Sequence, residues 1–204
     1  RIPGTQDADD AQQRRQHDVQ HASLAACTRD GHTIEITANI ASQAEAEQAM
    51  TLGAQGVGLL RSEFLYLERN SAPTHEEQVA TYRAIADAVG PEHNLVVRTL
   101  DVGGDKPLTY VPMAHEANPF LGMRGIRLCL ERPELLRDQL RAILASADLA
   151  RLHIMLPMVT HVSELHEARR VLQDEAQRAG LVQLPKLGIM IEVPAAALMA
   201  DVFA

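Results

Sequence analysis

Three charged residues of this sequence, Arg61, Arg98 and Glu192, each follow directly on a short apolar run. Apolar runs of this kind suit parallel strands that are covered on both faces. Because α/β folds place their ligands beyond the carboxyl ends of such strands, we expect the three side chains to meet at one edge of a sheet. Gly103 and Gly104, shortly after Arg98, would let the backbone turn tightly and approach a ligand closely.

Two guanidinium groups at one edge indicate a small anionic ligand, because arginine offers a planar fork of donors to phosphate or carboxylate. Glu192 adds a carboxylate, which is costly to bury without a partner. Each arginine alone also has a structural interpretation, and the ion pairs in question are Arg61 with Glu63 or Glu68, and Arg98 with Asp101. The three residues taken together favour a functional site.

The composition narrows the class of protein. The 204 residues are 46% hydrophobic with no Trp, and the formal net charge is −8. An acidic chain of ordinary hydrophobicity fits a globular protein and argues against a nucleic-acid partner. No apolar stretch reaches the roughly 18 residues of a membrane span, and no secretory signal opens the chain. The two cysteines, Cys27 and Cys129, lack metal-site spacing and indicate structural thiols in a reducing, cytoplasmic setting.

Strand and helix patterns alternate along most of the chain. The expected strands are Thr33–Ile40, Gly56–Leu60, Leu95–Leu100, Leu152–Met158 and Leu187–Val193. The expected helices follow them and cover 42–53, 74–90, the Arg- and Leu-rich segment up to Ser146, 163–179 and 194–203. Ser42 with Glu45, and Thr74 with Glu77, have the spacing of capping boxes. Residues 1–31 differ in composition and predict a mostly exposed helix, which is either a frayed leader or a linker to an upstream domain.

This alternation predicts βαβ units and a parallel sheet, which is an α/β fold. No Gly-x-Gly-x-x-Gly turn is present, which argues against a dinucleotide-binding fold. The remaining candidate is a (β/α)8 TIM barrel, which usually takes about 250 residues. We therefore expect residues 32–204 to form an incomplete barrel of about five βα units, with an open edge on the fifth strand.

Four segments carry a family resemblance. They are Gly53–Tyr66, Arg98–Lys106, Asn118–Arg127 and Ile191–Ala197, which occur in family order. Together they resemble the C-terminal domain of enzyme I of the bacterial phosphoenolpyruvate:sugar phosphotransferase system, the phosphoenolpyruvate–protein phosphotransferase. The string from Arg98 to Lys106 favours enzyme I over pyruvate phosphate dikinase and phosphoenolpyruvate synthase. The motifs fit both a plain enzyme I and a multiphosphoryl transfer protein, in which other phosphocarrier domains are fused to it.

The resemblance implies a phosphoenolpyruvate-binding TIM-barrel domain that depends on Mg²⁺ and forms a homodimer. In the family, a phosphoryl group passes from phosphoenolpyruvate to a histidine and then to the phosphocarrier HPr. By motif match, Arg61 and Arg98 are substrate-binding residues, Arg124 supports them, and Glu192 is a magnesium ligand.

Other family residues have no match in this sequence. These are the phosphoaccepting histidine, an Asn-Asp pair with the second magnesium ligand, a further arginine and the cysteine that protonates the enolate. Cys129 does not match that acid. Two hypotheses follow: the chain is part of a phosphotransferase, or by itself it is a non-catalytic binding and dimerisation module.

Overall fold

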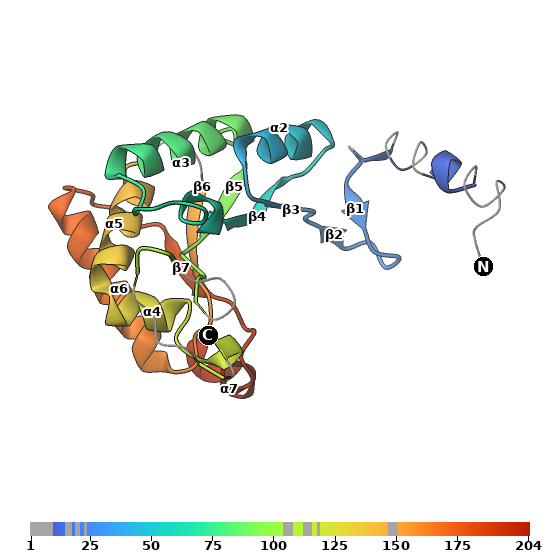
Figure 1. Ribbon diagram of the computed structural model, residues 1–204. Helices are drawn as coiled ribbons and strands as arrows, with labels where there is room; N and C mark the ends of the chain where they lie inside the picture. Colours follow the sequence, from blue (N-terminus) through green and yellow to red (C-terminus); the bar gives the residue numbers. More distant parts are fainter. Residues whose placement is uncertain are drawn as a thin grey trace.

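Five parallel strands follow one another across a single sheet in the order of the sequence (Figure 1). The computed structural model describes residues 10–14, 18, 21–22, 24–103, 108–111, 116–117, 119–146 and 151–204. The strands are β3 (Ala38–Ile40), β4 (Gly56–Arg61), β5 (Asn94–Arg98), β6 (Arg151–Leu156) and β7 (Lys186–Ile189). The α/β class and the number of parallel strands are confirmed. The sheet is not closed into a barrel, and β3 and β7 are its two edges.

The longer helices form one layer along the sheet, and two short helices follow them in the sequence. They are α2 (Gln43–Thr51), α3 (His75–Val89), α4 (Ile126–Glu131), α5 (Pro133–Leu144) and α6 (Val162–Arg178), followed by the short α7 (Pro194–Leu198) and α8 (Ala200–Phe203). Helix α2 contacts α3, α3 contacts α5, and α5 contacts α6, so these helices succeed one another on the same side (Figure 1).

Alternate strand residues show which side is covered. Leu95 and Val97 of β5, and Leu152, Ile154 and Leu156 of β6, are buried against this helix layer. Their neighbours Val96, His153 and Met155 have the opposite orientation and are only half-buried. The core therefore lies between the sheet and one layer of helices, and the other face of the sheet is partly open.

The expected first strand is interrupted. Thr33–Ile34 (β2) pairs antiparallel with Ala26–Cys27 (β1), and only Ala38–Ile40 joins the parallel sheet. Between them, Gln55 takes the place of a strand partner: its Oε1 accepts from the N–H of Ile36 at 2.7 Å, and its N–H donates to the Ile36 carbonyl at 2.8 Å.

The β1–β2 pair also bears on residues 1–31. Their described part includes helical residues at 10–14, 18 and 21, but Ala26 and Cys27 are strand rather than helix. The hairpin joins residues on both sides of the 31/32 boundary, which remains a prediction.

The predicted helix ends are mostly confirmed, and the exceptions have local causes. Thr74 and Glu77 form the complete capping box of α3. At α2 only half of the box forms, because the Glu45 carboxylate accepts from the N–H of Ala41 rather than that of Ser42. The helix expected before Ser146 is two helices, since the residue before a proline disfavours helical geometry and Arg132 precedes Pro133.

Candidate functional site

Arg61 and Arg98 end neighbouring strands and lie side by side. They are register partners in the parallel pairing of β4 and β5, so their side chains leave the sheet on the same face. Arg61 is exposed, whereas the Arg98 side chain is only 11% exposed. Within the described residues, the Arg61 side chain makes no hydrogen bond or ion pair. The predicted meeting of two guanidinium groups at one edge is consistent with this register.

Arg98 is held by two buried carboxylates. Its Nη2 donates to Glu63 Oε1 at 2.5 Å, and its Nη1 lies 3.4 Å from Asp101 Oδ2. The ion pair of Arg98 with Asp101 is therefore present, whereas Arg61 pairs with neither Glu63 nor Glu68 among the described residues. Glu63 follows β4 in a 3-10 turn, Ser62–Leu65, and this turn carries its carboxylate to the neighbouring strand rather than back to Arg61.

Arg124 shares one of these carboxylates. Its Nε and Nη2 donate to Asp101 Oδ1 at 3.2 and 3.1 Å, and Nη2 also donates to Oδ2 at 3.1 Å. The backbone brings the two segments together, because Gly103 and Arg124 form an isolated antiparallel bridge. A Cβ at Gly103 would lie 2.6 Å from Arg124 Cβ, so the bridge requires glycine. The residues Glu63, Arg98, Asp101 and Arg124 thus form one alternating cluster, which we call the strand-end cluster.

The cluster leaves donors unused. Among the described residues, the buried Nε of Arg98 and the buried hydroxyl of Thr99 have no hydrogen-bond partner. A guanidinium carries five N–H donors, and two carboxylates at one edge do not engage all of them. Arg98 therefore retains hydrogen-bonding capacity in addition to its two ion pairs.

Glu192 lies in the loop beyond β7, not within the strand that was expected to run to Val193. The ladder ends earlier because β6 ends at Leu156, whose carbonyl accepts the N–H of Met190 as the last backbone bond. This loop reaches the strand-end cluster, since Met190 Sδ lies 3.8 Å from Arg98 Nη1.

The Glu192 side chain is oriented by the backbone beyond β6. Its Oε1 accepts the N–H of Met158 at 2.8 Å, and Met158 has a left-handed φ of 61°. A single carboxylate of this kind fits Mg²⁺, which usually takes one or two protein carboxylates plus substrate oxygens and water. No group of three or more His, Cys, Asp or Glu side chains that could hold a metal occurs among the described residues. The prediction that Glu192 is a magnesium ligand therefore stays a prediction.

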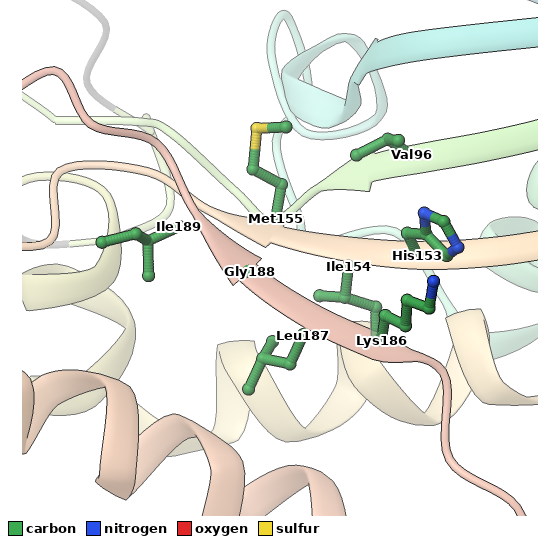
Figure 2. A pocket seen from close by; sticks show the side chains of 8 residues that line it. All are labelled: Val96, His153, Ile154, Met155, Lys186, Leu187, Gly188 and Ile189. Atoms are coloured by element: carbon green, nitrogen blue, oxygen red, sulfur yellow. The ribbon is translucent and has the colours of Figure 1, made fainter. Parts of the chain in front are cut away.

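A cavity of about 340 Å³ lies over β5, β6 and β7, next to the partly open face of the sheet. Figure 2 shows Val96, His153 and Met155 on the open side of the sheet, with the Lys186 ammonium group near the His153 ring. Burial and then the Lys186 cation lower the pKa of His153, which favours the neutral imidazole. Met155, which lines the cavity, is the register partner of Arg98, so the cavity lies next to the strand-end cluster.

The buried thiol of Cys129, next to the strand-end cluster, is in a setting that makes it unreactive. Cys129 is fully buried, its Sγ donates to the Leu100 carbonyl at 3.8 Å, and burial together with Asp101 raises its pKa to about 12. A thiol with this pKa is neither a ready nucleophile nor a ready acid. The prediction that Cys129 is structural fits this setting.

The whole-chain comparisons agree with the motifs. The domain model described as PEP-utilising enzyme, PEP-binding domain matches residues 14–204. The chain belongs to this family. No described helix is long and apolar enough to cross a bilayer.

Its relatives include phosphotransferases. The chain is 50% identical over 191 residues to a multiphosphoryl transfer protein of Xanthomonas campestris, and 93% of the chain but 23% of that protein is covered. It is 45% identical over 184 residues to the phosphoenolpyruvate-protein phosphotransferase of Staphylococcus carnosus, covering 87% of the chain and 32% of that protein. A phosphoenolpyruvate-protein phosphotransferase of a Bacillus species is 41% identical over 204 residues, covering 95% of the chain and 35% of that protein. The predicted resemblance is confirmed, and the chain spans a quarter to a third of the length of these relatives.

Sequence reasoning missed how the site residues are supported. Glu63 and Asp101 were considered only as alternatives to function, although both hold predicted site arginines in place. A carboxylate two or three residues beyond a strand-ending arginine was the available signal, but the choice of partner depends on the neighbouring strand. Gly104 and Asn118, which belong to the predicted motifs, lie outside the described residues.

Proposed function

We propose that this chain is the phosphoenolpyruvate-binding part of a phosphoenolpyruvate–protein phosphotransferase. The observation that carries the proposal is the exposed Arg61, whose side chain has no ion-pair partner among the described residues and which is in register with Arg98 at the strand ends of a phosphoenolpyruvate-binding family domain. In the whole protein, the phosphoryl group of phosphoenolpyruvate would pass to a histidine and then to HPr, and this transfer would drive sugar uptake.

The arginines would contribute to ligand binding in different ways. Phosphoenolpyruvate carries a phosphate and a carboxylate on a small rigid frame, and both groups suit a guanidinium fork. Arg61 offers all its donors to the ligand, whereas Arg98 and Arg124 are oriented in advance by Glu63 and Asp101. Phosphoryl transfer depends mainly on positioning and charge neutralisation, so donors that are oriented before the ligand arrives favour it.

Magnesium belongs to the same proposal. Glu192 would hold the ion at the mouth of the site, with its Oε1 kept in place by the N–H of Met158. A bound Mg²⁺ supplies Lewis-acid neutralisation of phosphoryl oxygens. The protein's own part is to keep one carboxylate fixed near Arg98 through the Met190–Glu192 loop.

The finer description of the fold is also proposed. Strands in strict sequence order with helices on one side are what right-handed crossovers produce in a (β/α)8 barrel, where the open face becomes the interior. The half-buried inner residues Val96, His153 and Met155 support this reading. The TIM-barrel type, a linker over residues 1–31 and a cytoplasmic location complete the proposal.

A homodimer is the expected assembly. Several large apolar side chains that follow β5 and β7 in the sequence are exposed, namely Phe120, Leu121, Ile191 and Leu198. Exposed apolar surface favours association. Light scattering of the purified chain should give twice the monomer mass or more, and a monomer at micromolar concentration would contradict the dimer.

A binding and dimerisation module without turnover is the second candidate. It is favoured by the contents of the strand-end cluster, whose described contacts are made by arginines, carboxylates and a thioether, with no histidine among them. Adding HPr and a separate histidine domain distinguishes the two hypotheses. Release of pyruvate from phosphoenolpyruvate would rule out the inactive module.

The binding proposal is tested most directly at Arg61, because its side chain has no described partner to disturb. Arg61→Ala should raise the Kd for phosphoenolpyruvate by roughly tenfold or more, since a hydrogen bond to a charged group is worth about 1.5–3 kcal/mol. Calorimetry with Mg²⁺ measures the affinity, and Tm should not change. Arg151→Ala is the matched control, since Arg151 is exposed at the amino end of β6. Equal affinities for Arg61→Ala and the unsubstituted chain would remove Arg61 from the site.

A further inference from the structure

A fully buried amide lies behind the two arginine-bearing segments. Gln139 of α5 is 0% exposed. Its Nε2 donates to Ser62 Oγ at 2.9 Å and to the Tyr82 hydroxyl at 3.0 Å, and its Oε1 accepts the N–H of Leu100 at 2.8 Å. One side chain therefore links three separate segments of the chain.

Two of these segments deliver the charged residues of the site. Ser62 stands between Arg61 and Glu63, and Leu100 stands between Arg98 and Asp101. The residues touched by Gln139 lie on the core side of these segments, as their full burial shows. Gln139 is thus bonded to both segments without being part of the charged cluster.

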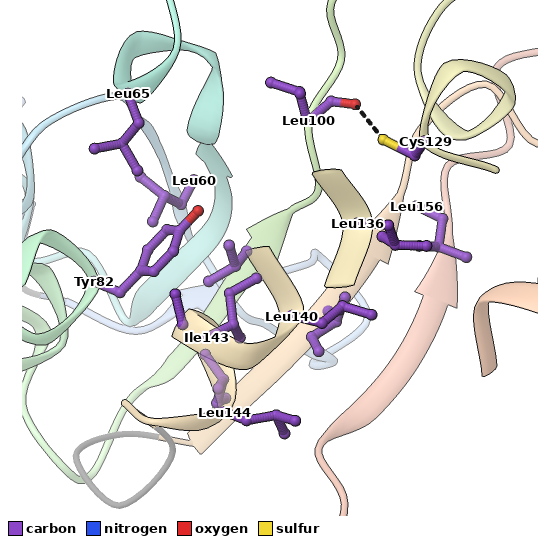
Figure 3. Close-up of a cluster of buried hydrophobic side chains, with 14 of the residues drawn as sticks. Leu60, Leu65, Tyr82, Leu100, Cys129, Leu136, Leu140, Ile143, Leu144 and Leu156 are labelled. Atoms are coloured by element: carbon purple, nitrogen blue, oxygen red, sulfur yellow. Dashed lines mark hydrogen bonds between the residues drawn. The ribbon is translucent and has the colours of Figure 1, made fainter. Parts of the chain in front are cut away.

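The apolar surroundings of Gln139 require that its amide group be fully hydrogen-bonded. Figure 3 shows Leu60, Leu65 and Ile143 around the Tyr82 ring in the same core. A buried amide in apolar surroundings must satisfy its donors and acceptor, because an unpaired polar group there is costly. A methionine of similar size would fill the space equally well but would not define how Ser62 and Leu100 lie relative to each other. A fully satisfied polar network in a core specifies one arrangement among several that apolar packing would accept.

We propose that Gln139 is a positioning residue that sets the separation of Arg61 and Arg98 by holding both strand ends from behind. The inference rests on the proposed function, because it assumes that one ligand engages both arginines. Such a ligand depends on their spacing, whereas a ligand held by a single arginine does not.

The substitution Gln139→Met keeps the volume and removes the three hydrogen bonds. Calorimetry should compare phosphoenolpyruvate, which can span two guanidinium groups, with inorganic phosphate, which one guanidinium can hold. We expect the Kd for phosphoenolpyruvate to rise about tenfold and the Kd for phosphate to change less than about twofold. A purely structural defect would weaken both ligands alike, and that result would overturn the positioning role.

Amide hydrogen exchange of the ligand-free chain tests the same inference without any ligand. In Gln139→Met, exchange should accelerate at Leu100 and at Tyr66 and Leu67, whose N–H groups bond to the Glu63 carbonyl. The matched control Ser146→Ala removes another buried hydrogen bond of the same helix region, and it should leave these amides unchanged. Unchanged exchange in Gln139→Met would overturn the inference. Failure of the unsubstituted chain to bind phosphoenolpyruvate would instead count against the proposed function, and the exchange result would still decide on Gln139.

A smaller change covers the case in which Gln139→Met does not fold. Ser62→Ala removes the link of Gln139 to the β4 segment and leaves its bonds to Tyr82 and Leu100. It should accelerate exchange at Tyr66 and Leu67 but not at Leu100. It should also raise the Kd for phosphoenolpyruvate relative to the Kd for inorganic phosphate. An unchanged ratio together with unchanged exchange would contradict the role of Gln139.

Discussion

Two clusters of arginine and carboxylate groups in this protein are built in opposite ways. In the strand-end cluster both signs are buried, with side-chain exposures of 7% for Glu63, 11% for Arg98 and 12% for Arg124. Between α5 and α6 only the carboxylate of Glu175 is buried, at 1%, and it accepts from three arginines that are 26%, 46% and 62% exposed, namely Arg137, Arg141 and Arg178. We call this second group the helix cluster.

The difference shows what each cluster is suited to do. Removing both partners of an ion pair from water costs more than removing one, so a stabilising cluster gains by leaving its cations solvated. The helix cluster leaves its arginines solvated in this way, whereas the strand-end cluster buries its arginines. Burial of both signs at the strand ends is understandable if the arginines must be desolvated and oriented for a ligand, which supports the proposed function.

The largest expected effect is at Glu63. Glu63→Leu would leave the buried Arg98 guanidinium with one carboxylate partner among the described residues, Asp101, at the longer distance of 3.4 Å. Loss of one partner of a buried pair typically costs about 3–5 kcal/mol of unfolding free energy. Urea denaturation measures it, and a loss below about 1 kcal/mol would break the contrast between the two clusters.

At Glu175 the expected loss is smaller. In Glu175→Leu the three arginines can turn towards water, so the cost is limited to hydrogen bonds with charged groups, about 1.5–3 kcal/mol. The same denaturation experiment applies. Glu167→Leu is the matched control, because its pair with Arg170 is exposed on the same helix and should contribute little. If Glu175→Leu cost more than Glu63→Leu, cation exposure would not be what distinguishes the clusters.

The pH dependence of stability should also carry the signature of Glu175. Burial raises its pKa, but hydrogen bonds from Arg137 and Arg141 and the nearby cations outweigh burial, so the pKa lies below its usual 4.5. The folded state then binds fewer protons than the unfolded state, and this stabilisation is present above pH 4.5 and lost as the pH falls through the folded-state pKa. The unfolding free energy of Glu175→Gln should therefore fall less between pH 5 and 3 than that of the unsubstituted chain. Parallel curves would exclude this contribution.

The smallest effect concerns the thiols, which report on opening near the strand-end cluster. Cys27 is exposed and should react at once with a disulfide reagent, whereas the buried Cys129, with its raised pKa, should react only when the structure opens. Glu63→Leu should speed the slow phase more than Glu175→Leu does, because Cys129 lies against Leu100 and near Asp101. Equal acceleration by the two substitutions would show that Cys129 senses global unfolding alone.

Local sequence patterns were sufficient where the cause is local. The capping box of Thr74 and Glu77, the apolar runs of β4 to β6 and the positions of Arg61 and Arg98 at strand ends were predicted and are confirmed. These features depend on side-chain periodicity and on contacts within three or four residues. The barrel type was predicted from strand counting, and the open five-strand sheet supports only the α/β class with parallel strands.

The amino-acid sequence alone determined which charged residues stand beside strand ends, because periodicity and turn chemistry act over a few residues. The partners of those residues were decided by the tertiary structure. Glu63 bonds Arg98 of the neighbouring strand, and Glu192 lies beyond a strand that stops where β6 stops. Gln139 bonds Leu100, 39 residues away, and Ser62, 77 residues away. Choices of partner over such separations depend on strand register and helix packing, which the spacing of residues along the chain does not encode.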